Sequence, residues 1–115
     1  MDPEVTVGEL RRLVAKFVKE REWESYHNPK DLAIAISIEA GELLELFLWR
    51  DFTEHSKLEG QHVEKVMDEL ADMVIYCLMF ANAQGWDLSD AIKVKIRKDE
   101  LKYPIEKYRG HAEFI

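Results

Sequence analysis

The sequence is poor in the residues that break or cross-link a chain. Its 115 residues include one cysteine, three prolines and five glycines. The single cysteine, Cys77, excludes an internal disulfide, and so few prolines and glycines argue against the many turns of small β-proteins. Hydrophobic residues make up 47% of the chain, which argues against disorder. The sequence therefore predicts one folded domain over residues 1–115.

A long hydrophobic run is also missing. The apolar stretch at residues 73–81 has nine residues, whereas a membrane span needs about 20. The first residues, Met1-Asp2-Pro3-Glu4, are acidic and lack the basic-then-apolar form of a signal peptide. We therefore expect no membrane partner and a cytoplasmic location.

A net positive charge is missing as well. The formal charge of −7 argues against a general nucleic-acid-binding surface. Residues 93–109 depart from this trend, with seven basic and three acidic side chains. Such a segment can hold phosphate or can be a solvated helix face, and charge alone does not decide between the two.

Hydrophobic periodicity and capping residues predict four helices. The first starts after Thr6, an N-cap with Glu9 at the capping-box position, and reaches about Glu22. The second starts at Asn28-Pro29, where asparagine is the N-cap and proline the first helical residue, and reaches about Trp49. Residues 50–57 are predicted to be a polar connection.

The third helix is predicted from about Gln61 to Gln84, before Gly85, a glycine typical of a helix end. The fourth follows Asp87 or Ser89 and ends at about Lys102, before Pro104. The tail, residues 105–115, has no clear period. Parts of the second and third helices are apolar nearly all round, which favours a central position in the fold, a subunit interface, or both.

Two pairs of acidic residues distinguish the second and third predicted helices. Glu39 and Glu42 are three residues apart, as are Glu69 and Asp72. Side chains at this spacing are neighbours on a helix surface, so each pair presents two carboxylates among apolar residues. Charges in such surroundings need a compensating cation. No lysine or arginine lies between residues 30 and 50 or between residues 65 and 93.

If the two helices pack antiparallel, both pairs can face one groove and bind a hard divalent cation, Mg²⁺ or Mn²⁺, through oxygen ligands. Two other interpretations stay open. The acids can be ordinary solvated side chains of amphipathic helices. A di-iron carboxylate bundle needs two Glu-x-x-His motifs on its helices, and Glu59-x-x-His62, which lies at a helix entry, matches that form.

The segments that hold these carboxylates resemble the two-part metal motif of the MazG-like all-α nucleotide pyrophosphohydrolases. Within that family, the sequence is similar to the branch of the dCTP pyrophosphatases. The resemblance rests on these segments: Glu39-Ala40-Gly41-Glu42-Leu43, Glu69 to Tyr76, Trp23-x-x-x-His27-x-Pro29, Glu45-Leu46-Phe47-x-Trp49, and Lys95 with Tyr103-Pro104. One position departs from the pattern, because Asp99 stands where the family usually has asparagine; its role is left open between facing a metal and altering substrate choice.

The resemblance implies a four-helix MazG-like bundle assembled as a homo-oligomer, with a tetramer favoured over a dimer. The implied reaction is Mg²⁺-dependent hydrolysis of a nucleoside triphosphate to monophosphate and pyrophosphate, which would remove unwanted nucleotides. The implied site residues are Glu39, Glu42, Glu69 and Asp72 for Mg²⁺, Trp23, His27, Trp49 and Tyr76 for the nucleoside, and Lys95 for phosphate. Glu39 is our choice for the carboxylate that accepts the proton of the attacking water.

Each of these roles has a plainer alternative. Tyr76 lies in the apolar stretch and can be a core residue, while Trp23, His27 and Trp49 lie near predicted helix ends and can pack or cap them. A function of another class is a non-catalytic helical protein that oligomerises through its third helix and leaves its acids solvated. Metal binding separates the two classes, because such a module would ignore Mg²⁺.

Overall fold

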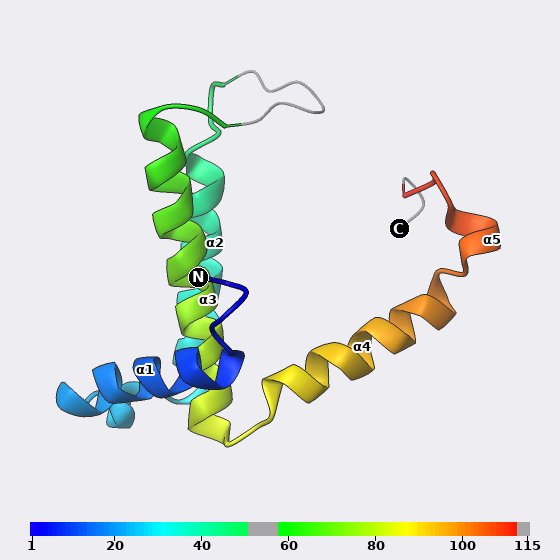
Figure 1. Ribbon diagram of the computed structural model, residues 1–115. Coiled ribbons are helices and arrows are strands. Elements are labelled where there is room, and N and C mark those ends of the chain that lie inside the picture. The colour runs from blue at the N-terminus through cyan, green and yellow to red at the C-terminus, as the bar shows by residue number, and fades with distance from the viewer. Residues whose placement is uncertain (51–57, 113–115) are drawn as a thin grey trace. The chain divides into compact units, whose positions relative to one another are not determined.

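The computed structural model describes residues 1–50 and 58–112. In these ranges the chain forms helices joined by turns and irregular segments, without a β-strand, which confirms the predicted all-α fold class (Figure 1). The chain divides into two compact units, Met1–Gly85 and Trp86–Ile115. The prediction of one domain and of one four-helix bundle stays a prediction.

The first unit holds the helices that carry the acidic pairs. It contains α1 (Val7–Glu20), a short 3₁₀ helix η1 (Glu24–Tyr26), α2 (Pro29–Glu45) and α3 (Gln61–Gln84). α2 and α3 lie side by side and antiparallel, and α1 crosses the pair near the end of α3 (Figure 1). The premise of the predicted metal groove, an antiparallel pair of helices, is therefore present.

Side-chain caps account for the starts of α1 and α2. The amide of Glu9 donates to Thr6 Oγ1 over 3.1 Å, and the amide of Asp31 donates to Asn28 Oδ1 over 2.8 Å. Pro29 occupies the first turn of α2, where its missing N–H costs no helical hydrogen bond. Both starts agree with the predictions from the sequence.

The predicted ends are less accurate than the starts. α3 ends at Gln84 as predicted, because Gly85 takes a left-handed conformation with φ of 71°. α1 ends at Glu20 rather than about Glu22, and α2 ends at Glu45 rather than about Trp49. Beyond Glu45 the backbone amides bond three residues back instead of four, so the helix gives way to tight turns, although the sequence there stays apolar.

The second unit consists of α4 (Leu88–Lys102) and the short α5 (Ile105–Tyr108). The amide of Asp90 donates to Asp87 Oδ1 over 2.9 Å, so Asp87 rather than Ser89 caps α4. α5 was not predicted. The predicted polar connection includes residues 51–57, which lie outside the described residues. The last residues of the tail, 113–115, lie outside them as well.

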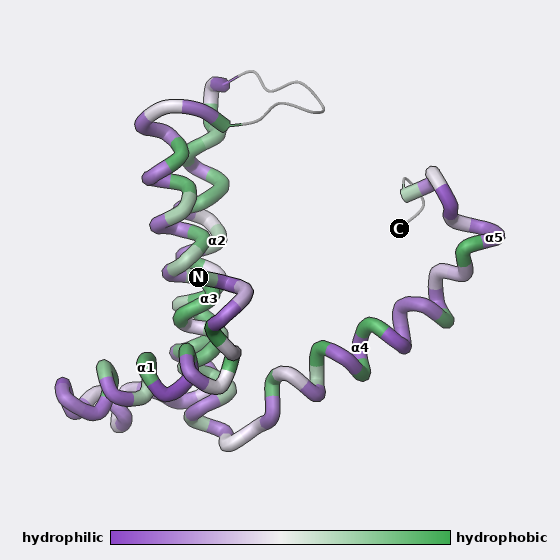
Figure 2. Tube along the Cα trace, viewed as in Figure 1, coloured by the Kyte–Doolittle hydropathy of each residue, from purple (hydrophilic) through white to green (hydrophobic). Residues whose placement is uncertain are grey.

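The buried core of the described chain is small. Its members come from the first unit: Val14, Val18, Leu32, Leu78, Met79 and Ala81. Apolar residues continue along α2 and α3 beyond this core (Figure 2), and several large ones stay exposed there, among them Ile34, Ile38, Leu70 and Val74. Of the helices that the structure describes, none has both the length and the apolar character to cross a membrane.

Candidate metal centre and adjacent cavity

Three carboxylates from two helices meet in the first unit. Glu39 extends from α2, and Glu69 and Asp72 extend from α3 one turn apart. One oxygen from each of the three lies within 4.8 Å of the others. The antiparallel packing of α2 on α3 thus joins residues that are thirty positions apart in sequence, as the spacing of the two pairs predicted.

The fourth predicted ligand, Glu42, lies one turn after Glu39 and outside that closest group of oxygens. Its negative charge nevertheless acts on both Glu39 and Glu69. Glu42 is exposed, as is Asp72, whereas Glu39 and Glu69 are half-buried. The four acids therefore form one electrostatic cluster with a buried side and an open side.

The protonation of the cluster reflects this crowding. Burial raises the pKa of Glu39 to about 7, and the hydrogen bond with Glu69 and the charge of Glu42 add to the rise. The hydrogen bond with Glu39 lowers the pKa of Glu69, but desolvation and the charges of Glu42 and Asp72 outweigh it, so the net shift is upward. Without a cation, the cluster therefore favours holding a proton between Glu39 and Glu69.

The oxygens of this cluster fit a divalent cation. Oε2 of Glu39 and Oε2 of Glu69 are buried and accept no hydrogen bond. None of the ion pairs between described residues includes a member of the cluster. A donor set made of carboxylate oxygens suits a hard ion such as Mg²⁺ or Mn²⁺, and such an ion would compensate charges that none of these ion pairs compensates.

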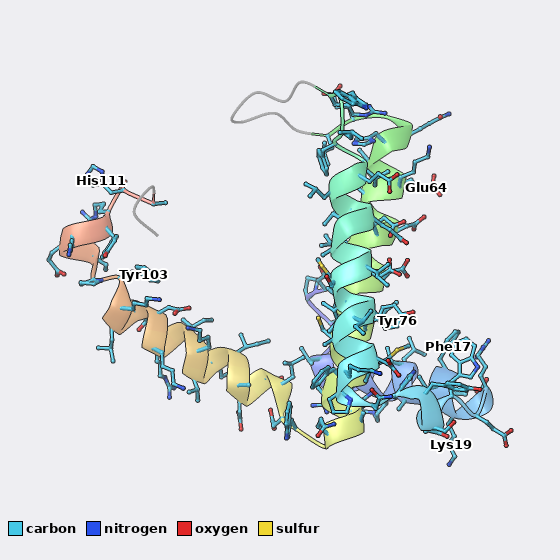
Figure 3. The ribbon with its side chains drawn as sticks, turned by 180° about the vertical axis from the view of Figure 1, so that it is seen from behind. Phe17, Lys19, Glu64, Tyr76, Tyr103 and His111 are labelled. Carbon is cyan, nitrogen blue, oxygen red and sulfur yellow. The ribbon has the colours of Figure 1, made fainter. Side chains whose placement is uncertain are left out.

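A cavity of about 590 Å³ lies beside the cluster, between α1 and α3. Its lining is mostly apolar and comprises Leu10, Leu13, Val14, Phe17, Trp23, Ala71, Asp72, Val74, Ile75, Tyr76, Leu78 and Met79. Figure 3 labels Phe17 on α1 and Tyr76 on α3, the helices that form the two walls. Asp72 belongs both to this cavity and to the acidic cluster, so a molecule in the cavity would lie against the metal centre.

Two of the four predicted nucleoside residues line this cavity. Trp23 packs edge to face on Phe17, with the ring centroids 5.7 Å apart, and Tyr76 is half-buried in the opposite wall. The volume is within the usual range for small-molecule sites, about 300–1,000 Å³. The aromatic and apolar walls suit a flat organic ring.

The other two predicted nucleoside residues lie elsewhere in the described unit. His27 lines a separate cavity of about 430 Å³, together with Lys19, Glu24 and Asn82. Trp49 lies beyond the far end of α2, is 94% exposed and has a φ of 63°. Within one chain, the structure therefore brings Trp23 and Tyr76 together but not His27 or Trp49.

Lys95, the predicted phosphate ligand, belongs to α4 in the second unit. Its Nζ donates to Asp99 Oδ1 over 2.7 Å, one helical turn away. This hydrogen bond and the charge of Asp99 raise the pKa of Lys95. Asp99, whose role the sequence left open, is thus the partner of the proposed phosphate ligand.

The sequence analysis missed the contribution of α1 to the cavity. An apolar stripe of α1, made of Leu10, Leu13, Val14 and Phe17, lines the cavity, and only Val14 of the four is buried. The other three leave apolar surface open on the wall of the cavity. The sequence did carry a signal of this open wall. The apolar stripe of α1 is wider than the small core beside it can cover, so some of its residues stay unpacked.

Comparison with known proteins identifies relatives of this chain. A model of the MazG-like family matches residues 34–113. The dCTP pyrophosphatase 1 of Mus musculus is 38% identical over 112 residues, which are 96% of this chain and 66% of that protein. The dCTP pyrophosphatase 1 of Homo sapiens is 36% identical with the same coverage. The chain thus spans just under two thirds of the length of these curated relatives.

A solved structure is similar over a larger share of its own chain. A pyrophosphatase from Archaeoglobus fulgidus matches with a TM-score of 0.73 and 38% sequence identity, covering 84% of this chain and 91% of that chain. The family model includes both carboxylate pairs of the cluster, which lie between residues 39 and 72. The resemblance inferred from the motifs is confirmed, and the chain belongs to the MazG-like family.

Proposed function

We propose that the protein is a Mg²⁺-dependent nucleotide pyrophosphohydrolase that splits a nucleoside or deoxynucleoside triphosphate into monophosphate and pyrophosphate. Mn²⁺ is the alternative cation. The expected role is removal of unwanted nucleotides in the cytoplasm. The names of the relatives, dCTP pyrophosphatase and pyrophosphatase, support this class of reaction.

The observation that carries the proposal is the shared position of Asp72. It belongs to the carboxylate cluster with Glu39 and Glu69, and it lines the aromatic cavity that Trp23 and Tyr76 also line. A base in that cavity would have its phosphates near the cluster, since a nucleotide joins the two by its ribose. Aromatic side chains stack on any base, which agrees with a site that selects nucleotides as a class.

The proposed reaction is attack of water on the α-phosphorus with pyrophosphate as the leaving group. A bound Mg²⁺ would neutralise charge on the phosphate oxygens and make the water more acidic. Glu39 accepts the proton of the water in our proposal, because its carboxylate lies in the cluster that would hold the metal and its water and a carboxylate can act as a general base. Glu42, Glu69 and Asp72 would share the metal with it.

The substrate contacts outside the cavity are proposed from the family resemblance. Lys95 would meet phosphate as a point charge, with Asp99 as its partner within α4. His27 and Trp49 would contact the nucleoside from positions that a single chain does not bring to the cavity. A homo-oligomer, with a tetramer favoured over a dimer, would allow a neighbouring subunit to supply them.

The alternative function is a non-catalytic helical module that oligomerises through α3. The exposed apolar residues of α3, such as Leu70 and Val74, favour that alternative as well as an oligomeric enzyme. The module would not require a cluster of buried, unpaired carboxylate oxygens, which are costly without a cation. Binding of Mg²⁺ by the cluster therefore decides between the two functions.

The test is a pyrophosphate-release screen over standard and modified nucleotides, with Mg²⁺ and with a chelator. We expect release with Mg²⁺ alone, and phosphorus NMR should identify monophosphate and pyrophosphate as the products. Diphosphate with orthophosphate would refute the proposed bond cleavage. Absence of turnover with every nucleotide, together with absence of Mg²⁺ binding by calorimetry, would favour the non-catalytic module.

A further inference from the structure

Two hydrogen bonds join α1 to the last turn of α3. Nε of Arg11 donates to Oδ1 of Asn82 over 2.8 Å, and Nδ2 of Asn82 donates back to the backbone oxygen of Arg11 over 3.0 Å. Both bonds are partly buried and link residues 71 positions apart. Asn82 thus uses both ends of its amide on one residue of α1.

This reciprocal pair lies at the edge of the proposed nucleoside cavity without lining it. Arg11 follows Leu10 and precedes Leu13 on α1, and both leucines line the cavity. Asn82 follows Leu78 and Met79, which line it from α3. The pair therefore joins the two helices right beside the residues that form the two walls of the cavity.

The apolar contacts of α1 with α3 leave that relative position weakly defined. The buried residues of α1 are Val14 and Val18, and burial of apolar surface stabilises contact without a preferred direction. Hydrogen bonds have narrow limits in distance and angle. The two bonds of Asn82 consequently fix where α1 lies along α3. The position of α1 in turn sets where Phe17 and Trp23 lie opposite Tyr76.

We propose that Arg11 and Asn82 are positioning residues for nucleotide binding, which hold the α1 wall of the cavity at the distance from α3 that a base requires. The inference rests on the proposed function, because it takes the cavity between α1 and α3 as the nucleoside site. Neither residue lines the cavity that would hold the base. Their loss therefore acts on substrate affinity, while the carboxylate cluster on α2 and α3 continues to turn over what binds.

The experiment compares steady-state kinetics of three variants of the full chain with wild type. Asn82→Leu removes both bonds and should raise KM for the nucleotide about tenfold with kcat within about twofold, since each partly buried bond is worth a few-fold in affinity. Asn82→Asp keeps the acceptor for Arg11 Nε and loses the donor, so its KM should fall between the two. Arg12→Ala is the matched control, because Arg12 is the exposed neighbour of Arg11 on α1.

A fourth variant separates positioning from general loss of stability. Leu32→Val removes one methylene group from the buried core on α2, where Leu32 is 2% exposed. It should lower Tm and leave KM unchanged. A wild-type KM for Asn82→Leu would overturn the inference, as would an equal rise of KM in Leu32→Val or in Arg12→Ala. Wild-type protein that neither binds nor cleaves any nucleotide would instead refute the proposed function, and the inference with it.

Discussion

The four carboxylates of the candidate metal centre differ in their surroundings. Glu39 and Glu69 each have a buried oxygen without a hydrogen bond, so replacing either one changes both the charge and the packing of the unit. Asp72 is exposed and joins the cluster from the side of the cavity. Of the three carboxylates that meet most closely, Asp72 is therefore the one whose removal tests chemistry with the least effect on folding.

We expect Asp72→Asn to lower turnover by roughly a hundredfold or more, because it removes one charged ligand from a metal whose charge stabilises the transition state. The helical circular dichroism should not change, since the side chains are nearly equal in size. The matched control is Asp68→Asn, one turn earlier on α3, exposed and outside the cluster. Near-normal turnover of Asp72→Asn would contradict the assignment of the metal centre.

The pKa of Glu39 gives a second test that needs no substrate. Its value in the folded chain is about 7, raised from 4.5, so the metal-free folded chain binds more protons than the unfolded chain between these values. Its free energy of unfolding should therefore fall as pH rises from about 4.5 to about 7. Mg²⁺ binds the deprotonated cluster, so it should stabilise the chain more at about pH 7.5 than at about pH 5.

Thermal unfolding at several pH values, with and without Mg²⁺, measures both effects. Glu39→Gln is the control, because it removes the titrating group and should reduce the fall of Tm with pH. Tm that is independent of Mg²⁺ at the higher pH would show that the cluster holds no cation. A change of Tm with pH that is equal in wild type and Glu39→Gln would show that Glu39 does not titrate in this window.

The placement of single residues could be predicted from the sequence where it depends on local spacing. The carboxylates at positions 39, 69 and 72 meet because a separation of three places each pair on one helix face and because α2 and α3 are antiparallel. The division of the aromatic residues among cavities could not be predicted. Trp23 and His27 are four residues apart in sequence, yet they line different cavities, because the chain turns through η1 between them.

At the scale of helices, the predicted starts agree with the structure where a side chain caps the helix. The predicted end of α3 before Gly85 agrees as well. Asn28-Pro29 and Gly85 specify a backbone conformation that few other residues provide. The end of α2 carries no such signal. Apolar residues continue from Leu43 to Trp49, so a pattern based on hydrophobicity extends the helix by one turn beyond Glu45, where the structure has turns.

The turn between α1 and α2 gives a prediction for Trp23. Its indole lies in the cavity wall against Phe17, so Trp23→Ala should weaken nucleotide binding by about 1–3 kcal/mol, the usual value of one stacked base. Trp23→Phe keeps an aromatic ring and should recover part of the affinity. Titration of each variant with a non-hydrolysable nucleotide measures the effect, and unchanged binding by Trp23→Ala would place the base outside this cavity.

At the scale of the whole molecule, exposed apolar surface is the feature that single-chain packing does not explain. Large hydrophobic side chains are exposed on α2 and α3, including Ile38, Leu44, Met67 and Leu70. Extended patches of this kind usually mark an interface. We expect an oligomer at micromolar concentration by light scattering, and a monomer mass would contradict that expectation.

Trp49 gives a prediction that links this surface to the candidate site. α2 has 17 residues and is therefore about 25 Å long. Trp23 precedes its first turn and Trp49 follows its last, so the two indoles of one chain cannot reach the same base. If both contact the nucleoside, Trp49 must come from a neighbouring subunit, and Trp49→Ala should raise KM although the side chain is 94% exposed within its own chain.

Mixing two defective subunits tests this shared site. A Trp49→Ala subunit keeps an intact cavity and cluster, because Trp23 and Asp72 line one cavity of a single chain, and an Asp72→Asn subunit keeps Trp49. Mixed oligomers should therefore regain some sites with every residue intact and bind nucleotide with wild-type KM. A mixture of Trp23→Ala with Asp72→Asn is the control, because there the intact Trp23 and the intact Asp72 lie in different subunits. If subunits exchange and the first mixture behaves like the control, Trp49 does not contribute to a neighbour's site.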